Sequence, residues 1–289
     1  MALAEHERMN SRSRVTGETQ SLRFARLTLD ASYLSDRGRV RPINEDSAGV
    51  VIPEDAGVLD RKGILMVVAD GMGGHEGGEL ASRMTVDRVC RSYYAADSDP
   101  QTALTGALNE ANREVLHYAQ LNPQLAGMGT TCTAMAVVNG GAWLAHVGDT
   151  RLYLVRNSSA YRMTQDHSAT MDLVKRGLLT LSEADHHEER NVILRAVGTR
   201  EHVEAATWKD PFPLQPGDRL LICSDGFYET IPDEEIGRIC STSGGSVQAC
   251  EALVNLALDR DGSDNITVAV LFVGSELEKA AQEKREAEK

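Results

Sequence analysis

Four aspartates stand at the ends of apolar segments that have the character of buried strands. Asp70 follows ILMVVA, Asp149 follows WLAHVG and Asp225 follows LLICS, whereas Asp264 comes just before ITVAVLFV. If these strand ends meet at one edge, the carboxylates would repel one another, and oxygen-preferring Mg²⁺ or Mn²⁺ would relieve that repulsion. An aspartate beside a glycine often merely starts a turn, an alternative that explains any single one of them more readily than all four.

A further segment combines an arginine with paired acids. In RPINED, Arg41 lies shortly before Glu45 and Asp46, at the entry to a predicted strand. A guanidinium can hold a phosphate group through two parallel hydrogen bonds, and adjacent acids suit a metal ion or its water. An arginine near acids is more often a surface salt bridge, so this assignment depends on the rest of the site.

Composition limits the class of protein. The chain has 289 residues and a net charge of −13, which argues against nucleic acid as a partner. No apolar run is long enough for a membrane span, and the N-terminus lacks the apolar core of a secretory signal, so we expect a cytoplasmic protein without a membrane partner. Its five cysteines are scattered without a CxxC pair, which indicates buried reduced thiols instead of zinc sites or disulfides.

The order of the predicted elements favours antiparallel sheets over a doubly wound parallel fold. Strands are predicted at residues 47–52, 64–69, 130–138, 143–147, 151–155, 219–223 and 266–273, and helices at 78–95, 100–121, 168–183, 233–240 and 247–258. Asn139-Gly140 is a strong hairpin signal, and a two-residue turn requires antiparallel strands. We therefore expect an α+β protein in which packed antiparallel sheets are covered by pairs of helices.

One domain is the simplest organisation. We expect a flexible N-terminal arm over residues 1–25, a single domain over residues 26–274 and a charged C-terminal tail over residues 275–289. The charged stretch at residues 169–190 is expected to form a solvated flap beside the site.

Eight short motifs follow one another over about residues 30–273. They are RPINED, VVADGMGGHEGGE, GMGTTC, VGDTRLYLV, TQDHS, LRAVGT, LICSDGFYE and SDNITV. Together they resemble the bacterial branch of the metal-dependent serine/threonine protein phosphatases, the type 2C or PPM family. The resemblance implies an α-β-β-α sandwich and hydrolysis of phosphoserine and phosphothreonine on proteins by a metal-activated water.

The resemblance also implies roles for the acidic residues and Arg41. Two Mn²⁺ or Mg²⁺ ions per active site would be held by Asp70 between them, by the Gly71 carbonyl, by Asp225 and Asp264, and by Glu45 and Asp46. Asp149 would hold a possible third ion, and Arg41 would bind the substrate phosphate and act with Asp70 in catalysis. A phosphorylated protein, a cognate Ser/Thr kinase and a monomeric state are the implied partners and assembly.

Departures from the family pattern leave alternatives open. Met72 stands where eukaryotic relatives carry a histidine that could protonate the leaving group, so no general acid is assigned, and His75 is favoured as a bracing residue. Glu229 stands where many relatives carry a further metal-binding aspartate, which leaves the third site open. The alternative function is a catalytically weak phosphatase fold that binds phosphoproteins, for which loss of Asp70, Asp225 or Asp264 would be the signature, and all three are present.

Overall fold

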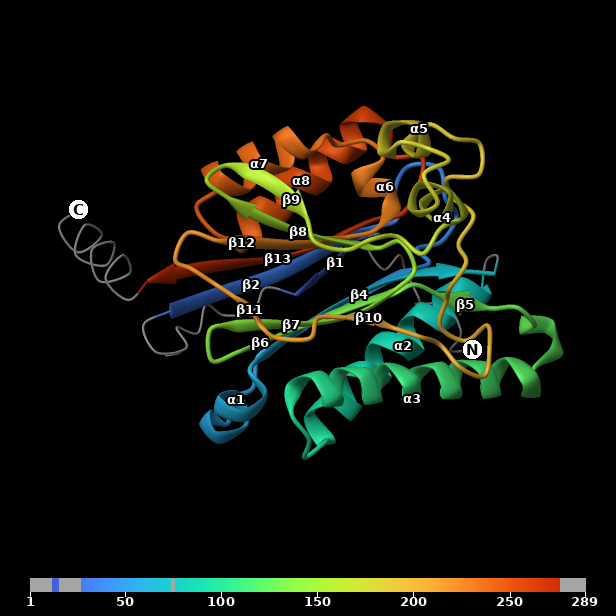
Figure 1. The fold of residues 1–289 in the computed structure, drawn as a ribbon, viewed down its shortest axis with the longest axis horizontal. Coiled ribbons are helices and arrows are strands. Elements are labelled where there is room, and N and C mark those ends of the chain that lie inside the picture. The colour runs from blue at the N-terminus through green and yellow to red at the C-terminus, as the bar shows by residue number, and fades with distance from the viewer. Residues whose placement is uncertain (1–11, 16–26, 74–75, 276–289) are drawn as a thin grey trace, which may run out of the picture.

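The computed structural model describes residues 12–15, 27–73 and 76–275, and these form four layers. Two antiparallel sheets stack face to face, with α2 (Glu76–Ala95) and α3 (Pro100–Leu121) outside one sheet and α7 (Asp233–Thr242) and α8 (Ser246–Arg260) outside the other (Figure 1). The predicted α+β sandwich of packed antiparallel sheets with paired helices is confirmed.

The first sheet has six strands, all paired antiparallel. Their spatial order is β1 (Arg12–Val15), β2 (Leu27–Asp36), β13 (Ile266–Ser275), β12 (Arg219–Cys223), β8 (Arg151–Arg156) and β9 (Ser159–Arg162). Sequence analysis missed β2, although it pairs with β13 along ten residues. Polar residues interrupt its apolar pattern, and distant partners satisfy them: Asp30, for example, accepts hydrogen bonds from the backbone and hydroxyl of Ser246.

The second sheet places β4 (Ile64–Met72) between β3 and β6. Its order is β10 (Ala206–Thr207), β7 (Gly141–Val147), β6 (Cys132–Val138), β4 and β3 (Asp46–Val51), while β11 (Phe212–Pro213) also pairs with β7 and β5 (Gly129–Thr130) with β4. The predicted hairpin between β6 and β7 is confirmed: Asn139 and Gly140 both have positive φ, 51° and 79°, as a type I′ turn requires.

Several predicted elements differ in detail. The strand predicted at residues 130–138 is broken at Thr131. Its backbone N–H still donates to the Asp70 carbonyl, but the Asp70 N–H donates to the Thr131 hydroxyl instead of to a backbone carbonyl. The helix predicted at residues 168–183 is wrong as a single element. It consists of α4 (Ala169–Lys175) and α5 (Leu181–Asp185), separated by a turn in which Gly177 has φ 71°. The structure adds α1 (Ala56–Lys62), η1 (Pro123–Leu125) and α6 (Asp225–Tyr228).

Local sequence signals explain the long helix α3. The Asp99 side chain accepts hydrogen bonds from the backbone N–H groups of Gln101 and Thr102, and Pro100 occupies the first turn, where its missing N–H costs nothing. The cap and proline predicted from the sequence therefore lie where expected.

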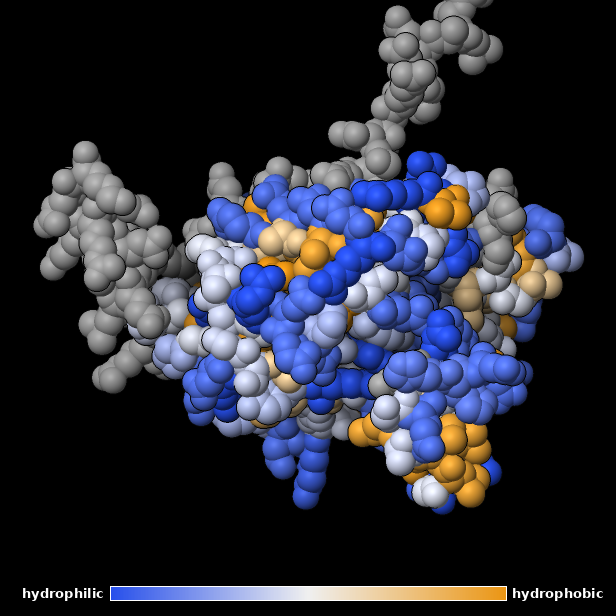
Figure 2. Space-filling view, turned by 90° about the horizontal axis from the view of Figure 1, so that it is seen from above, coloured by the Kyte–Doolittle hydropathy of each residue, from blue (hydrophilic) through white to orange (hydrophobic). Residues whose placement is uncertain are grey.

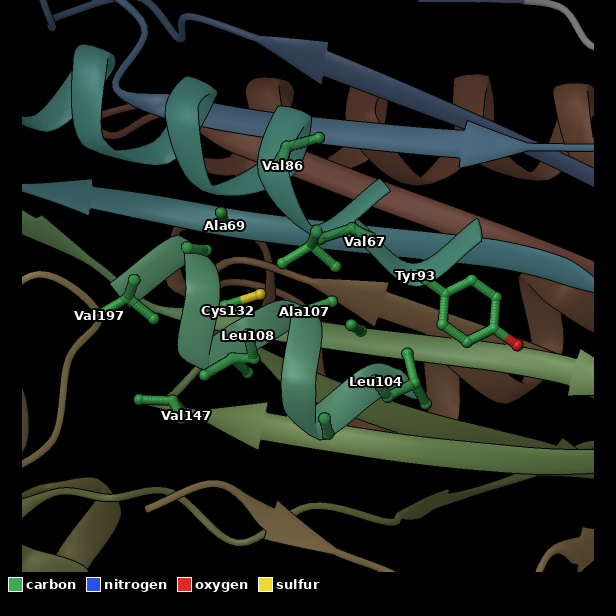
Figure 3. Packing of buried hydrophobic residues seen from close by; sticks show 14 of the residues in the cluster. Val67, Ala69, Val86, Tyr93, Leu104, Ala107, Leu108, Cys132, Val147 and Val197 are labelled. Carbon is green, nitrogen blue, oxygen red and sulfur yellow. The ribbon is translucent and has the colours of Figure 1, made fainter. Parts of the chain in front are cut away.

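Strand β4 is buried on both faces, which fixes its register. Ile64, Met66 and Val68 pack between the two sheets, while Val67 and Ala69 face the helices α2 and α3 (Figure 3). Each fully buried aliphatic side chain contributes about 1.5–3 kcal/mol, and a slip of one residue would exchange the two faces. Packing on both sides therefore holds the end of β4, where Asp70 stands, in one position.

The chain ends fall mostly outside the described residues. In the predicted arm only residues 12–15 are described, as β1, and of the predicted tail only Ser275, the last residue of β13. For the other residues of these two segments, the flexible arm and the charged tail stay predictions. The five cysteines are free, and four of them are buried. The connection between β9 and β10, residues 163–205, contains α4 and α5 and includes the residues 169–190 that were predicted as a flap. The whole connection is called the flap below.

Candidate active site

The acidic residues predicted from the sequence lie at one edge of the sandwich, where strand ends of the two sheets come together. Asp46 and Asp70 face each other across β3 and β4, so their side chains share one face of the second sheet. The Ser224 hydroxyl, at the end of β12 in the first sheet, donates to Asp46 Oδ2 over 2.7 Å. Asp225 follows directly after Ser224, so this hydrogen bond joins the carboxylates of the two sheets at one edge.

Burial and mutual repulsion raise the pKa values of Asp46 and Asp225. Burial, reinforced by the charges of Asp225 and Asp264, raises the pKa of Asp46 to about 7, although Ser224 and Thr267 partly oppose the shift. Burial and the charge of Asp264 raise the pKa of Asp225 to about 6.

Asp70 and Asp149 belong to the same cluster. The pKa of Asp70 lies well above its ordinary value because of burial and then the charges of Asp225, Asp46, Asp149 and Asp264. The pKa of Asp149 is raised well above its usual range by burial and by Asp225. The structure therefore brings Asp46, Asp70, Asp149, Asp225 and Asp264 within electrostatic reach of one another.

Arg41 reaches this cluster through Asp264. Its Nη2 atom donates to Asp264 Oδ2 over 2.6 Å, and this hydrogen bond is the main reason why the pKa of the guanidinium is raised. The charges of Glu45 and Asp225 also act on it. The arginine predicted to hold a phosphate group thus lies at the exposed rim of the acidic cluster.

Asn265 organises the loop that carries Arg41, a role that sequence analysis did not assign. Its Oδ1 atom accepts from the Glu45 backbone N–H over 2.8 Å, and its Nδ2 atom donates to the carbonyls of Arg37 and Ile43 over 2.8 and 3.0 Å. The only sequence signal was its position beside Asp264, because the three partners lie more than 200 residues away in the chain.

Gly71 is required by close backbone packing. Its N–H donates to the Glu45 carbonyl over 3.1 Å, and a Cβ there would lie 2.2 Å from the Gly78 carbonyl oxygen. The carboxyl group of Glu45 in turn packs against Gly78, where a Cβ would be 3.0 Å from its Cδ atom. Glycines at both places let the end of β4, the RPINED loop and the start of α2 approach closely.

Asp149 is connected to the flap. Gly148, with φ 102°, donates its N–H to Nδ1 of His167 over 3.1 Å and accepts from the His167 N–H over 2.8 Å. His146 lies nearby, fully buried, with its ring nitrogens against the Thr133 hydroxyl and the Gln165 carbonyl. Burial lowers the pKa of His146 to about 3, so it is a neutral packing residue.

Glu229 links Asp225 to the flap. Its charge raises the pKa of Asp225, and its Oε1 atom pairs with Arg190 Nε over 3.3 Å. The residue that replaces the family's further aspartate therefore faces a flap arginine as well as the cluster. Met72 ends β4, whereas His75 lies outside the described residues.

The donor set fits hard divalent cations. Within the described ranges, no three His, Cys, Asp or Glu side chains already stand in the arrangement of a finished metal site. Protein donors occupy two of the oxygens, because Ser224 holds Asp46 Oδ2 and Arg41 holds Asp264 Oδ2. Several buried carboxylates with raised pKa values lie at one edge, and Mg²⁺ or Mn²⁺ would relieve the repulsion among them.

Comparison with known proteins decides the family. A model of the protein phosphatase 2C family matches residues 43–252. The chain belongs to this family. Among curated relatives, it is 34% identical over 248 residues to the serine/threonine phosphatase stp of Listeria innocua, which covers 84% of this chain and 95% of the relative.

Solved structures of phosphatases have the same fold. The serine/threonine phosphatase PstP/Ppp of Mycobacterium tuberculosis superposes with a TM-score of 0.74 at 33% identity, covering 84% of this chain and 98% of that one. The catalytic domain of PstP in complex with two manganese ions gives a TM-score of 0.73 at 32% identity, covering 86% and 100%. None of the helices in the described residues is both long and apolar enough to cross a membrane.

Proposed function

We propose that this protein hydrolyses phosphoserine and phosphothreonine esters on proteins with the help of divalent cations. The observation that carries the proposal is the meeting of Asp46 and Asp70 from one sheet with Asp225 and Asp264 from the other, beside Arg41. The chain belongs to the protein phosphatase 2C family, and the relatives named above are serine/threonine phosphatases.

We assign the cations to the acidic cluster. Asp70 would lie between two Mn²⁺ or Mg²⁺ ions, with the Gly71 carbonyl, Glu45, Asp46, Asp225 and Asp264 completing their shells, and Asp149 would hold a possible third ion. The all-oxygen donor set and the two manganese ions of the PstP catalytic domain support this assignment. When bound, the cations supply a lowered water pKa and stabilisation of the charge that develops on the phosphoryl oxygens.

The residues of the chain itself bind and orient the substrate. Arg41 binds the phosphate group, since its guanidinium is half exposed at the rim and can donate two parallel hydrogen bonds. Asn265 fixes the loop that carries Arg41, and Ser224 fixes the carboxylate of Asp46. Holding these groups in place before the substrate arrives lowers the cost of organising the transition state.

A cysteine nucleophile does not fit this site. Cys223 ends β12, two residues before Asp225, but it is fully buried. Burial raises the pKa of its thiol far above the ordinary value, so the nucleophilic thiolate is not accessible. Attack by water is therefore the better assignment, and no covalent phosphoenzyme is needed.

We also propose the setting in which the enzyme works. Its substrate would be a phosphorylated protein, and its counterpart a cognate Ser/Thr kinase, because the relatives are named serine/threonine phosphatases. The free cysteines agree with a reducing cytoplasmic compartment. A monomer is expected, which sedimentation analysis would test directly.

The test is turnover of p-nitrophenyl phosphate and of a phosphothreonine peptide, with and without Mn²⁺. We expect metal-dependent hydrolysis that falls by about 100-fold or more in Asp70→Ala and Asp225→Asn. Asp210→Asn is the matched control for Asp225→Asn, since it makes the same change on an exposed residue of the loop before β11. Metal-independent turnover, or full activity of Asp225→Asn, would refute the mechanism, and phosphoprotein binding without turnover would favour a binding module.

A further inference from the structure

A hydrogen-bond network supports the side chain of Asp46. It is called the Asp46 network and consists of Ser35 in β2, Asn44, Asp46, Ser224 and Thr267 in β13. Hydrophilic residues predominate on the face of the molecule seen in Figure 2, where water can satisfy their polar groups. Ser35, Ser224 and Thr267 are instead 3%, 0% and 0% exposed, so their hydroxyl groups need partners within the protein.

Ser224 and Thr267 both present hydroxyl groups to Asp46. Ser224 Oγ donates to Asp46 Oδ2 over 2.7 Å, and the Thr267 hydroxyl also donates to this carboxylate. The two donors fix each other, because the Thr267 N–H donates to Ser224 Oγ over 3.0 Å and the Ser224 N–H donates to the Thr267 carbonyl over 3.1 Å. Since a carboxylate has about four lone-pair sites, two hydroxyl donors can hold its orientation and leave other sites for a cation or its water.

The chain of donors continues beyond Thr267. Ser35 is paired with Thr267 across β2 and β13, and their hydroxyl oxygens lie 2.7 Å apart. The single O–H of Thr267 points to Asp46, which can only accept when it is ionised, so the O–H of Ser35 must point to Thr267. Asn44 Nδ2 donates in turn to Ser35 Oγ over 2.8 Å. The hydrogens of this chain thus all point toward Asp46.

Asn44 closes the network on Asp46 itself. Its Oδ1 atom accepts from the Asp46 N–H over 3.2 Å, while its Nδ2 atom starts the donor chain at Ser35. These two bonds also fix which way the amide group of Asn44 faces, since its oxygen meets a donor and its nitrogen an acceptor. Buried hydrogen bonds that point in one direction polarise and strengthen one another. Asp46 is therefore held through its backbone and through its carboxylate at once.

Mutual satisfaction of buried hydroxyl groups does not account for this arrangement. The fold tolerates a hydroxyl group without a partner at Thr85, which is 0% exposed and whose Oγ1 atom has no hydrogen-bond partner among the described residues. Two hydroxyl groups could also satisfy each other without both converging on one carboxylate. Their convergence on Asp46, a member of the acidic cluster, points to a role in the site.

We propose that the hydroxyl groups of Thr267 and Ser35 are positioning groups, which hold the Asp46 carboxylate in the orientation that binds a divalent cation or its water. Asn44 acts through them, from the far end of the chain. The inference rests on the proposed phosphatase function and extends its machinery to residues that act on the reaction only through Asp46.

The experiment removes one hydroxyl group at a time. Thr267→Val keeps the shape of the side chain without the donor to Asp46, Thr267→Ser keeps the donor, and Ser35→Ala removes the group that precedes it in the chain. Thr85→Val is the matched control, because it makes the same change at a buried threonine outside the network. Calorimetric titration of metal-stripped protein measures Mn²⁺ affinity, and turnover of p-nitrophenyl phosphate at saturating Mn²⁺ measures kcat and KM.

We expect Thr267→Val to bind Mn²⁺ about tenfold more weakly and to lose about tenfold in kcat, because it removes a partner that orients a metal-binding side chain. Its KM should stay within about twofold of the wild type, since Arg41 still binds the phosphate group. Thr267→Ser should recover Mn²⁺ affinity and kcat to within about twofold, and Ser35→Ala should lose only about threefold, because the direct donor to Asp46 remains. Thr85→Val should match the wild type in all three constants.

Two results would overturn the inference. One is a folded Thr267→Val variant with the Mn²⁺ affinity and kcat of the wild type. The other is a Thr267→Ser variant as impaired as Thr267→Val, since packing and not the hydroxyl group would then be responsible. If circular dichroism shows that Thr267→Val does not fold, Ser35→Ala decides, and wild-type Mn²⁺ affinity in that variant overturns the inference.

Failure of the proposed function looks different. The wild type would then not hydrolyse p-nitrophenyl phosphate with Mn²⁺, whereas the calorimetric comparison of the variants would still test how Asp46 is held.

Discussion

The ion pair between Arg41 and Asp264 makes metal affinity a direct test of the proposed centre. Arg41 Nη2 lies 2.6 Å from Asp264 Oδ2, and the two side chains are 48% and 33% exposed. A cation that binds Asp264 through this oxygen must first displace the guanidinium. Removal of Arg41 should therefore strengthen metal binding while it weakens catalysis, a combination that a purely structural role would not produce.

The magnitude follows from the exposure of the pair. An ion pair open to solvent contributes about 0.5–1 kcal/mol after screening, which corresponds to a factor of about two to five in an equilibrium constant. We expect Arg41→Ala to bind Mn²⁺ about two- to fivefold more tightly than the wild type. Its kcat/KM should nevertheless fall by about 100-fold, because a charged donor to the phosphate group is lost.

Arg39→Ala is the matched control for Arg41→Ala. Arg39 lies on the same loop and loses the same charge, but it pairs with Asp259, outside the cluster, over 3.0 Å. At about 0.15 M salt, screening should leave less than about a twofold effect on Mn²⁺ affinity. Calorimetric titration of metal-stripped protein measures both constants. Unchanged or weaker binding by Arg41→Ala, or equal strengthening by Arg39→Ala, would refute the reasoning.

Two further predictions concern stability. His146 is buried and neutral, with a pKa lowered to about 3. Its contribution to the free energy of unfolding is therefore fully present above the unfolded-state pKa near 6.5 and is lost as pH falls below that value. Between pH 7.5 and pH 5, the free energy of unfolding measured in urea should fall by about 2 kcal/mol more in the wild type than in His146→Asn. An equal fall in the two proteins would contradict a neutral His146 in the folded state. Gly71→Ala should destabilise by about 2 kcal/mol or more, since its Cβ would lie 2.2 and 2.5 Å from two backbone oxygens. Gly106→Ala, in α3 with nothing within 4 Å, should instead stabilise by about 0.5–1 kcal/mol, and a thermal unfolding series in which both behave alike would count against the packing argument.

Where a structural feature depends on neighbours in the chain, the sequence was sufficient to predict it. Asp99 and Pro100 start α3, and Asn139-Gly140 turns β6 into β7, because cap and turn geometry involve only adjacent residues. The motifs around Asp70 and Asp225 likewise predicted acidic residues at strand ends, and with them the family. The apolar run at residues 64–69 likewise predicted β4 as a buried strand.

Only the tertiary structure could decide what depends on distant partners. Strand β2 escaped prediction because Asp30 is satisfied by Ser246, 216 residues away, so its polar residues did not look like those of a buried strand. The hydrogen bond from Ser224 to Asp46, across 178 residues, brings the two sheets together at the acidic edge. Residue types and local spacing thus predicted which groups would carry the chemistry. Packing of the two sheets determined that the acidic groups share one edge and that Arg41 meets them there, since no local rule links strands so far apart in the chain.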